Sequence, residues 1–425
     1  MRPRGKLCPA FGPDFVRSLP AKLKKLDLFA DLSQETAMAL LGCLPAGLLE
    51  LNMHIGDCLK WNAEAFRSFA EGFPRQLRLL DFDLEGDLRG FGPLAAELAA
   101  SGLTTLRLSF GSVQHSEALA ELFAALPPSL TELQLLMQGI GLSDNCCEEL
   151  GRGLRRLTCL RALELHLEHC PVGRVLQAPC RSLINLELSL WTLGPADAIQ
   201  LSNFVNGSNL QRLGLYLEGP HPQVCRALTP LPASLEELDF NVWDRSVGGE
   251  AVLTLASELP PRLRVLHLHF LEADIIPAPN IETLLASLPT TTLHTLSLSF
   301  EWSGFCQLTE CSFPKKLRNL SLSGCLVMPE RPPQVPFVAA LARELPRLRH
   351  LRTLTLDFDG CCWKASEARA VLDAAAHTKK IHADFGTGCV EEDTPETWKA
   401  LLGPFQAQLG HSLRTPTDLS EQTLY

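Results

Sequence analysis

Residues 287–300 read SLPTTTLHTLSLSF, with leucines at 293, 296 and 298. From Leu296 to Phe300, apolar residues alternate with Ser297 and Ser299, the period of two expected of a strand that is buried on one face. The pair Leu288-Pro289 stands before this strand, and proline cannot continue the hydrogen bonding of a helix. The stretch therefore predicts the end of a helix followed by a half-buried strand.

The phrase LxxLxL in this stretch recurs along the chain, with successive copies about 23 to 34 residues apart. Copies begin at Leu23, Leu48, Leu77, Leu103, Leu130, Leu160, Leu183, Leu210, Leu235, Leu263, Leu293, Leu317 and Leu351, and a worn copy lies at residues 379–385. A fixed period of this length is typical of repeats that each pair one strand with one helix and bury their apolar faces only by stacking. We therefore expect about 13–14 repeats around one continuous core.

A helical pattern fills the space between copies. In SEALAELFAALP, residues 116–127, Leu119, Leu122 and Phe123 fall on one helical face. Ser116 is placed to cap the start of this helix, and the Leu-Pro pair ends it. The same Leu-Pro signal precedes the strand in several other repeats.

In phrase and period the chain resembles the leucine-rich repeat superfamily over roughly residues 20–390, and its long helix-backed repeats resemble the ribonuclease-inhibitor-like class. The resemblance implies an α/β solenoid, a curved horseshoe with parallel strands on its concave face and helices on its convex face. The family phrase usually has Asn or Cys at its ninth position, where the side chain bonds to backbone in the turn. Cys325 fits, but Glu168 and Trp191 stand at that position elsewhere. We therefore expect longer strands and less uniform turns.

The ends of the chain differ from the repeats and predict three parts. Residues 1–20 form a lead-in, residues 21–390 form the repeat domain, and residues 391–425 form a capping helix and a loose tail. The tripeptide at 394–396, Thr-Pro-Glu, reads as a helix start, since proline is favoured at the first helical position. This predicts a helix over about 395–403.

Composition restricts the function classes. The net charge of −10 opposes general binding to nucleic-acid phosphates and to anionic lipid. No apolar run is long enough for a membrane span, and no secretory signal is recognisable at the start. The 15 scattered cysteines without that signal favour reduced thiols in the cytoplasm, with the nucleus left open. We expect no cofactor, no catalytic residue and no metal site.

Polar residues between the leucines of each strand face solvent or a partner. In the earlier repeats they lean acidic, and in the last three they are mostly hydroxyl-bearing. Either this is an ordinary solvated face, or it is a recognition surface whose acidic part prefers basic protein partners. The candidate partner-binding residues are Asp81, Asp83, Glu164, His166, Glu187, Tyr216, Asp239, Asn241, Trp243, His267, His269 and Trp302.

Tryptophans recur just after predicted strands, at 191, 243, 302, 363 and more loosely 61. They predict a rim along one edge of the repeats. Tryptophan is enriched at binding hot spots. Each one either folds over the core to shield it or contacts a partner.

Two chemical alternatives concern the histidines. Asp239, His267 and Ser297 occupy equivalent positions in successive strands, in the order of an acid–base–nucleophile triad. An open repeat wall offers neither an oxyanion hole nor a water-excluding pocket, so hydrolysis is disfavoured. His267, His269 and His294 are close enough in sequence to raise a metal site, but no spacing rule supports one.

These observations favour a non-catalytic scaffold that binds a protein partner on its concave face and rim, because no nucleotide or metalloprotease motif is present. The alternative is a regulator of another enzyme, since related repeat arrays include activating proteins for the small GTPase Ran. A ubiquitin-ligase receptor of this family carries an F-box ahead of its repeats, and here the first repeat begins near residue 23.

Overall fold

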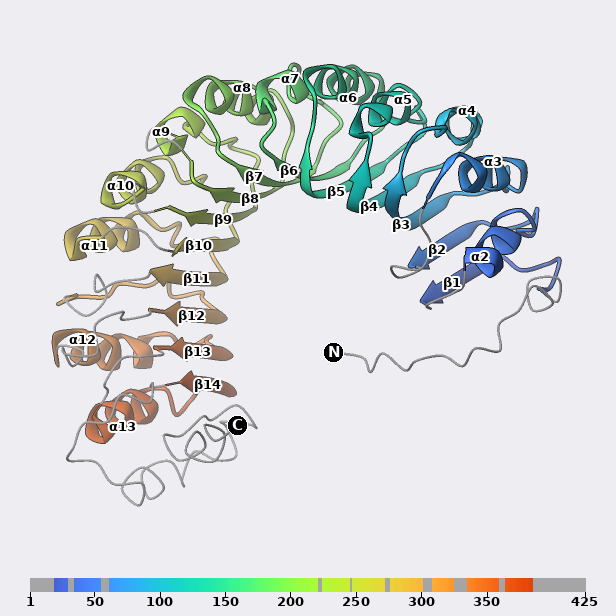
Figure 1. The fold of residues 1–425 in the computed structure, drawn as a ribbon. Helices are drawn as coiled ribbons and strands as arrows, with labels where there is room; N and C mark the ends of the chain where they lie inside the picture. The colour runs from blue at the N-terminus through green and yellow to red at the C-terminus, as the bar shows by residue number, and fades with distance from the viewer. Residues whose placement is uncertain are drawn as a thin grey trace, which may run out of the picture. The chain divides into compact units, whose positions relative to one another are not determined.

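A computed structural model describes residues 19–29, 34–54, 61–220, 224–244, 247–271, 276–300, 308–324, 335–358 and 364–384. The chain divides into two compact units. The first unit holds residues 1–192 and 196–210, and the second holds residues 193–195 and 211–425. Each unit is built from alternating strands and helices (Figure 1).

The first unit contains a sheet of parallel strands in which each strand pairs with the next one in sequence. The strands are β1 (Lys25–Phe29), β2 (Glu50–His54), β3 (Leu79–Asp87), β4 (Thr105–Gln114), β5 (Glu132–Gly141), β6 (Ala162–Glu168) and β7 (Asn185–Trp191). The helical segments are α2 (Gln34–Leu41), α3 (Ala63–Glu71), α4 (Gly92–Ala100), η1 (Ser116–Ala118), α5 (Leu119–Ala124), α6 (Asp144–Arg156), α7 (Val172–Val175) and α8 (Pro195–Asn206).

The second unit repeats this plan with the same sequential strand pairing. Its strands are β8 (Arg212–Glu218), β9 (Glu237–Trp243), β10 (Val265–Leu271), β11 (Thr295–Phe300), β12 (Asn319–Ser323), β13 (Thr353–Asp357) and β14 (Lys380–Asp384). Its helical segments are α9 (Val224–Leu228), α10 (Gly249–Ser257), α11 (Ala278–Ser287), α12 (Val335–Glu344), η3 (Leu345–Arg347) and α13 (Ala365–Ala374).

The register of the strands aligns the copies of LxxLxL. Leu296 pairs with Leu266 on β10 and with Leu320 on β12, so equivalent leucines stack from repeat to repeat. These leucines are at most 1% exposed, and the residues between them reach solvent. One strand and its helix thus bury their apolar faces against the next repeat. The predicted α/β leucine-rich repeat solenoid is confirmed, and the described residues contain 14 strands where 13–14 repeats were expected.

The departure from the family phrase predicted longer strands, and three strands of the first unit are longer than the others. β3, β4 and β5 have 9 or 10 residues, and the register shifts near their ends. At the ninth position of its repeat, Glu168 is only 9% exposed, and its Oε2 accepts a hydrogen bond from the Gly139 backbone N–H at 2.7 Å. The glutamate at this position therefore accepts a hydrogen bond from the backbone near the end of the preceding strand, β5.

One prediction on local structure is wrong, and the predictions for the two ends of the chain fall largely outside the described residues. Ser116 does not cap the helix that follows it, because it lies inside η1, a 3-10 turn that precedes α5. The predicted capping helix and tail at 391–425, with the helix over about 395–403, lie outside the described residues, as do all but the last two residues of the predicted lead-in at 1–20. Among the helices of the described ranges, none combines the length and the apolar character needed to cross a membrane.

Candidate functional site

The exposed strand positions form three rows, because parallel strands in register place equivalent residues side by side. The middle row runs from Asp27 to Glu187 in the first unit and from Gly214 to His382 in the second. We call these exposed positions the first strand face, on β1–β7, and the second strand face, on β8–β14. Of the candidate residues, all but Trp302, which is outside the described residues, lie on these strands.

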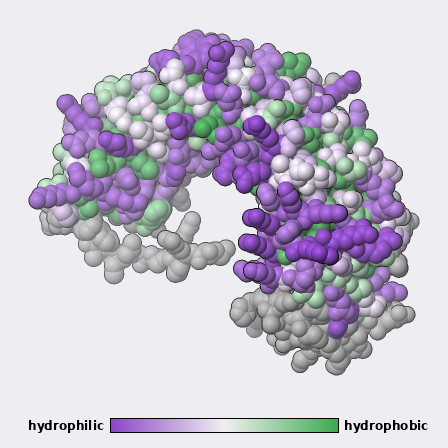
Figure 2. Space-filling view, turned by 180° about the vertical axis from the view of Figure 1, so that it is seen from behind, coloured by the Kyte–Doolittle hydropathy of each residue, from purple (hydrophilic) through white to green (hydrophobic). Residues whose placement is uncertain are grey.

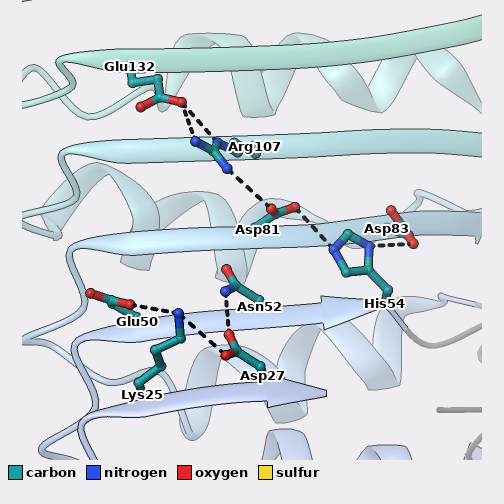
Figure 3. A network of polar contacts seen from close by, with 9 residues as sticks. All are labelled: Lys25, Asp27, Glu50, Asn52, His54, Asp81, Asp83, Arg107 and Glu132. Carbon is teal, nitrogen blue, oxygen red and sulfur yellow. Dashed lines mark hydrogen bonds and ion pairs between the residues drawn. The ribbon is translucent and has the colours of Figure 1, made fainter. Parts of the chain in front are cut away.

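A chain of charged groups crosses the first strand face from β2 to β5 (Figure 3). The His54 Nδ1 lies 2.9 Å from Asp83 Oδ2, and its Nε2 lies 3.6 Å from Asp81 Oδ1. Arg107 lies 3.9 Å from the other oxygen of Asp81 and donates to Glu132 at 2.6 Å. Two of the predicted residues, Asp81 and Asp83, therefore belong to one network.

A second group of contacts lies on β1 and β2 (Figure 3). The Lys25 ammonium is 3.4 Å from both Asp27 and Glu50. The Asn52 amide donates to the Asp27 carboxylate. Most of these side chains are more than two-fifths exposed, so each ion pair stabilises the fold only slightly.

Negative charge exceeds positive charge on the first strand face. Its three rows contain seven carboxylates and two cations. The carboxylates belong to Asp27, Glu50, Asp81, Asp83, Glu132, Glu164 and Glu187, and the cations to Lys25 and Arg107. In Figure 2 hydrophilic residues cover most of the visible described surface, and hydrophobic ones occur in scattered groups. Five carboxylates thus remain in excess of the cations.

The environment of Asp81 disfavours ionisation of its carboxyl group. Burial raises the pKa of the Asp81 carboxyl group, and electrostatic interactions with His54 and Arg107 offset only part of this effect. Ionised Asp83 and Glu132 nearby act in the same direction as burial. A further cation beside Asp81 would stabilise its carboxylate. The side chain is 21% exposed, so such a cation can reach it from solvent.

The candidate residues of β6 and β7 form a second cluster. Glu164, His166 and Glu187 have ligand atoms within 4.8 Å of one another, and His166 Nε2 lies 3.2 Å from Glu164 Oε1. The pKa of Glu164 is lowered, and this hydrogen bond is the largest cause. The cluster therefore keeps a carboxylate charged even in mildly acidic solution.

A pocket of about 360 Å³ opens beside this cluster. It is lined by His166, Leu167, Glu168, Ser189 and Trp191. The Trp191 ring is half-buried and stands edge-on to the ring of His169, with centroids 5.8 Å apart. The pocket thus offers an aromatic wall beside acidic side chains.

The second strand face brings together other candidate residues. Tyr216 donates its hydroxyl to Asp239 Oδ2 at 2.9 Å, and Asn241 donates its amide to Oδ1 at 2.6 Å. Asp239 pairs with His267 in the register of β9 and β10, and Asn241 pairs with His269. Burial lowers the pKa of His269, which keeps its ring neutral at neutral pH.

The register places Asp239, His267 and Ser297 side by side, as the triad alternative required. However, the buried Nε2 of His267 has no hydrogen-bond partner among the described residues. A serine nucleophile needs such a bond to its base, so this nitrogen does not activate Ser297. The row lacks the contact that would make it a triad through this nitrogen.

The tryptophans do not share one role. Trp61 is 2% exposed, packs against Phe66 and donates its indole N–H to the Asp83 carbonyl, so it shields the core. Trp191 is half-buried, and Trp243 is 53% exposed at the end of β9. Trp302 and Trp363 lie outside the described residues. Trp191 and Trp243 are thus the two described tryptophans that a partner could contact.

The sequence analysis missed Lys25, Glu50 and Glu132 as members of the polar networks. They occupy the first exposed position of their strands, whereas the candidate residues that the structure describes all lie at later exposed positions. A signal was available, since neighbouring parallel strands lie about 4.8 Å apart and long side chains reach across that gap. Opposite charges at nearby positions of successive copies would have predicted these contacts.

No protein-family model matches the chain, and no curated protein matches it. Among solved structures, the crystal structure of the Rad7 and Elc1 complex in yeast has 13% identity and a TM-score of 0.46, and the match covers 90% of this chain and 81% of that chain. The leucine-rich repeat-containing protein LegL7 from Legionella pneumophila has 18% identity and a TM-score of 0.31, with 92% and 99% covered. Because both scores are low, the fold class rests on the strand order, register and buried leucines described above.

Proposed function

We propose that this protein is a non-catalytic binding scaffold whose first strand face holds a basic segment of a protein partner. The observation that carries the proposal is the excess of carboxylates on this face, seven against two cations. Like charges that are gathered on one face repel each other and attract a complementary partner. Nucleic acid would be repelled, since its backbone is an anion.

The raised pKa of Asp81 supports binding of a cationic side chain at β3. Burial outweighs the interactions with His54 and Arg107 in setting the pKa of Asp81, so the ionised carboxylate is under-compensated in the free protein. A lysine or arginine from a partner would supply the missing charge. Arginine has the advantage that its planar fork can contact two carboxylate oxygens at once, and both Asp81 and Asp83 are on the exposed face.

The pocket at Trp191 supports a second anchor. A volume of about 360 Å³ is enough for one large side chain, and His166 and Ser189 supply polar contacts at its wall. A cation over the face of a tryptophan ring is attracted by the ring electrons. Seven strands at about 4.8 Å spacing span roughly 30 Å, the length of about nine extended residues. The face is thus matched to a short basic stretch of extended chain.

Binding to synthetic peptides of about nine residues, rich in arginine, tests the proposal on the full-length chain. We expect affinity to fall steeply as salt rises, because exposed charges are screened. The double variant Asp81→Asn/Asp83→Asn should lose at least tenfold in affinity. The matched control is Glu148→Gln/Glu149→Gln on α6, which changes the net charge equally but lies off the strand face.

Equal loss in both double variants would mean that only net charge matters, and the strand face would not be the site. Unchanged binding in the Asp81→Asn/Asp83→Asn variant would also overturn the proposal. Far-ultraviolet circular dichroism of each variant shows whether the repeats remain folded.

A further inference from the structure

The second strand face carries a cluster of metal-ligating groups on β9 and β10. Asp239, His267 and His269 each offer one ligand atom, and these atoms all lie within 4.8 Å of one another. We propose that these three residues bind a divalent late transition metal ion of the Zn²⁺ type. The site does not depend on the acidic first strand face, because all of its residues belong to the second unit.

The ligand set fits this class of ion. Two imidazoles and one carboxylate are the protein ligands of zinc sites that keep a fourth position open. Ligand atoms at about 2.0–2.1 Å from a tetrahedral ion lie roughly 3.4 Å apart. Closing the cluster from its present spacing requires small side-chain rotations and no change in strand register. Ca²⁺ and Mg²⁺ prefer sites made of oxygen and are disfavoured here.

Neighbouring side chains hold the carboxylate in place. Tyr216 and Asn241 each donate a hydrogen bond to one oxygen of Asp239. A carboxylate has about four acceptor positions, so these bonds orient Asp239 and leave lone pairs for an ion. Such bonds to a ligating group are a regular feature of metal sites and raise the affinity of the site.

The imidazole of His267 has an open nitrogen. Its Nε2 is buried and has no hydrogen-bond partner among the residues that the structure describes. Buried polar atoms normally find a partner, and a metal ion beside Asp239 would provide one. The rings of His267 and His269 lie at a centroid distance of 6.3 Å on the same side of β10. Both rings can thus reach a common ion.

The cluster of Glu164, His166 and Glu187 is a weaker candidate. It offers one imidazole, which is already bonded to Glu164, and its Glu187 is exposed. The two clusters therefore make an internal comparison within one chain. Three protein ligands at the second strand face leave a fourth coordination position, where water or a group from a bound partner can complete the shell.

Titration of the full-length chain with ZnCl₂, after removal of metal with a chelator, tests the site. Calorimetry should show one tight equivalent that disappears in His267→Gln and in His269→Gln. Tyr216→Phe should weaken binding about tenfold, since it removes a bond to a ligating group. His294→Gln is the matched control and should bind as the native chain does.

Thiols could bind zinc elsewhere, since Cys43 and Cys159 are exposed. Titration with Co²⁺ separates the two cases, because thiolate ligation produces an intense near-ultraviolet charge-transfer band that nitrogen and oxygen ligands do not. We expect a ligand-field spectrum in the visible without that band. Absence of a tight equivalent, a thiolate band, or equal binding by the His267→Gln, His269→Gln and control variants would overturn the proposal.

Discussion

The two strand faces rest on the same buried leucine pattern and carry different chemistry. On β1–β7 the exposed rows contain seven carboxylates and two cations. On β8–β14 they contain four carboxylates and two cations, and every exposed position of β11 and β12 is uncharged. Core positions obey the period of the repeat, whereas exposed positions are free to differ. We therefore assign the proposed recognition of a partner to the exposed rows.

The largest expected effect tests what the two units share. Phe82 on β3 and Phe240 on β9 hold the same place in the phrase, in LRLLDF and LEELDF, and each is at most 1% exposed. Because each would leave a large cavity, Phe82→Ala and Phe240→Ala should each lower the free energy of unfolding by about 3–5 kcal/mol. Urea denaturation followed by circular dichroism measures both. A loss below ~1 kcal/mol in one unit alone would break the equivalence of the two cores.

A smaller effect, of opposite sign, is expected for Asp81 on the first strand face. Since burial raises the pKa of Asp81, the folded state disfavours its ionised form at neutral pH. Asp81→Asn should therefore raise the free energy of unfolding, by no more than about 1 kcal/mol, while it weakens binding of the basic peptide. The gain should vanish below about pH 3.9, where the native carboxyl group is protonated in both states.

Thermal unfolding of Asp81→Asn and the native chain at pH 7 and pH 3 checks this sign. Ser297→Ala on the second strand face is the control, because serine does not titrate and should give the same difference at both pH values. A destabilised Asp81→Asn variant at pH 7 would mean that its contacts with His54 and Arg107 outweigh burial.

Glu164 should behave in the opposite way to Asp81. A hydrogen bond from His166 lowers the pKa of Glu164, so its carboxylate stabilises the fold above the unfolded pKa of about 4.3. This contribution is lost as pH falls through the lower folded value. Glu164→Gln should cost less than ~1 kcal/mol at pH 7, since the side chain is partly exposed, and the cost should decrease as pH is lowered toward 3. Equal cost at both pH values would point to a packing role instead.

The sequence predicts the buried positions of the strands better than it predicts the contacts among the exposed ones. The repeat of LxxLxL can be read directly from the sequence. It aligns Leu266, Leu296 and Leu320 on neighbouring strands, and their burial follows from it. The row of Asp239, His267 and Ser297 was predicted for the same reason. The rotamers and lengths of the exposed side chains then determine which of them form hydrogen bonds or ion pairs. The repeat pattern therefore did not show that Asp239 accepts from Tyr216, or that His54 bridges Asp81 and Asp83.

The smallest expected change in stability concerns the exposed rings at the two faces. Phe29 on β1 is 65% exposed and stacks on His54 at 4.8 Å, and Trp243 on β9 is 53% exposed. Since little of either ring is buried, Phe29→Ala and Trp243→Ala should each change the free energy of unfolding by less than about 0.5 kcal/mol. Trp61→Ala, which removes a ring that is 2% exposed, provides the contrast at about 3–5 kcal/mol.

Peptide binding by the same variants distinguishes the two faces. Phe29 lies beside the charged network through His54, so Phe29→Ala should weaken binding of the basic peptide severalfold. Trp243→Ala should leave that binding unchanged, because Trp243 is on the second strand face, where carboxylates exceed cations by two rather than by five. Equal weakening by both variants would contradict the assignment of the basic segment to the first strand face, and would direct the search for its contacts to β9.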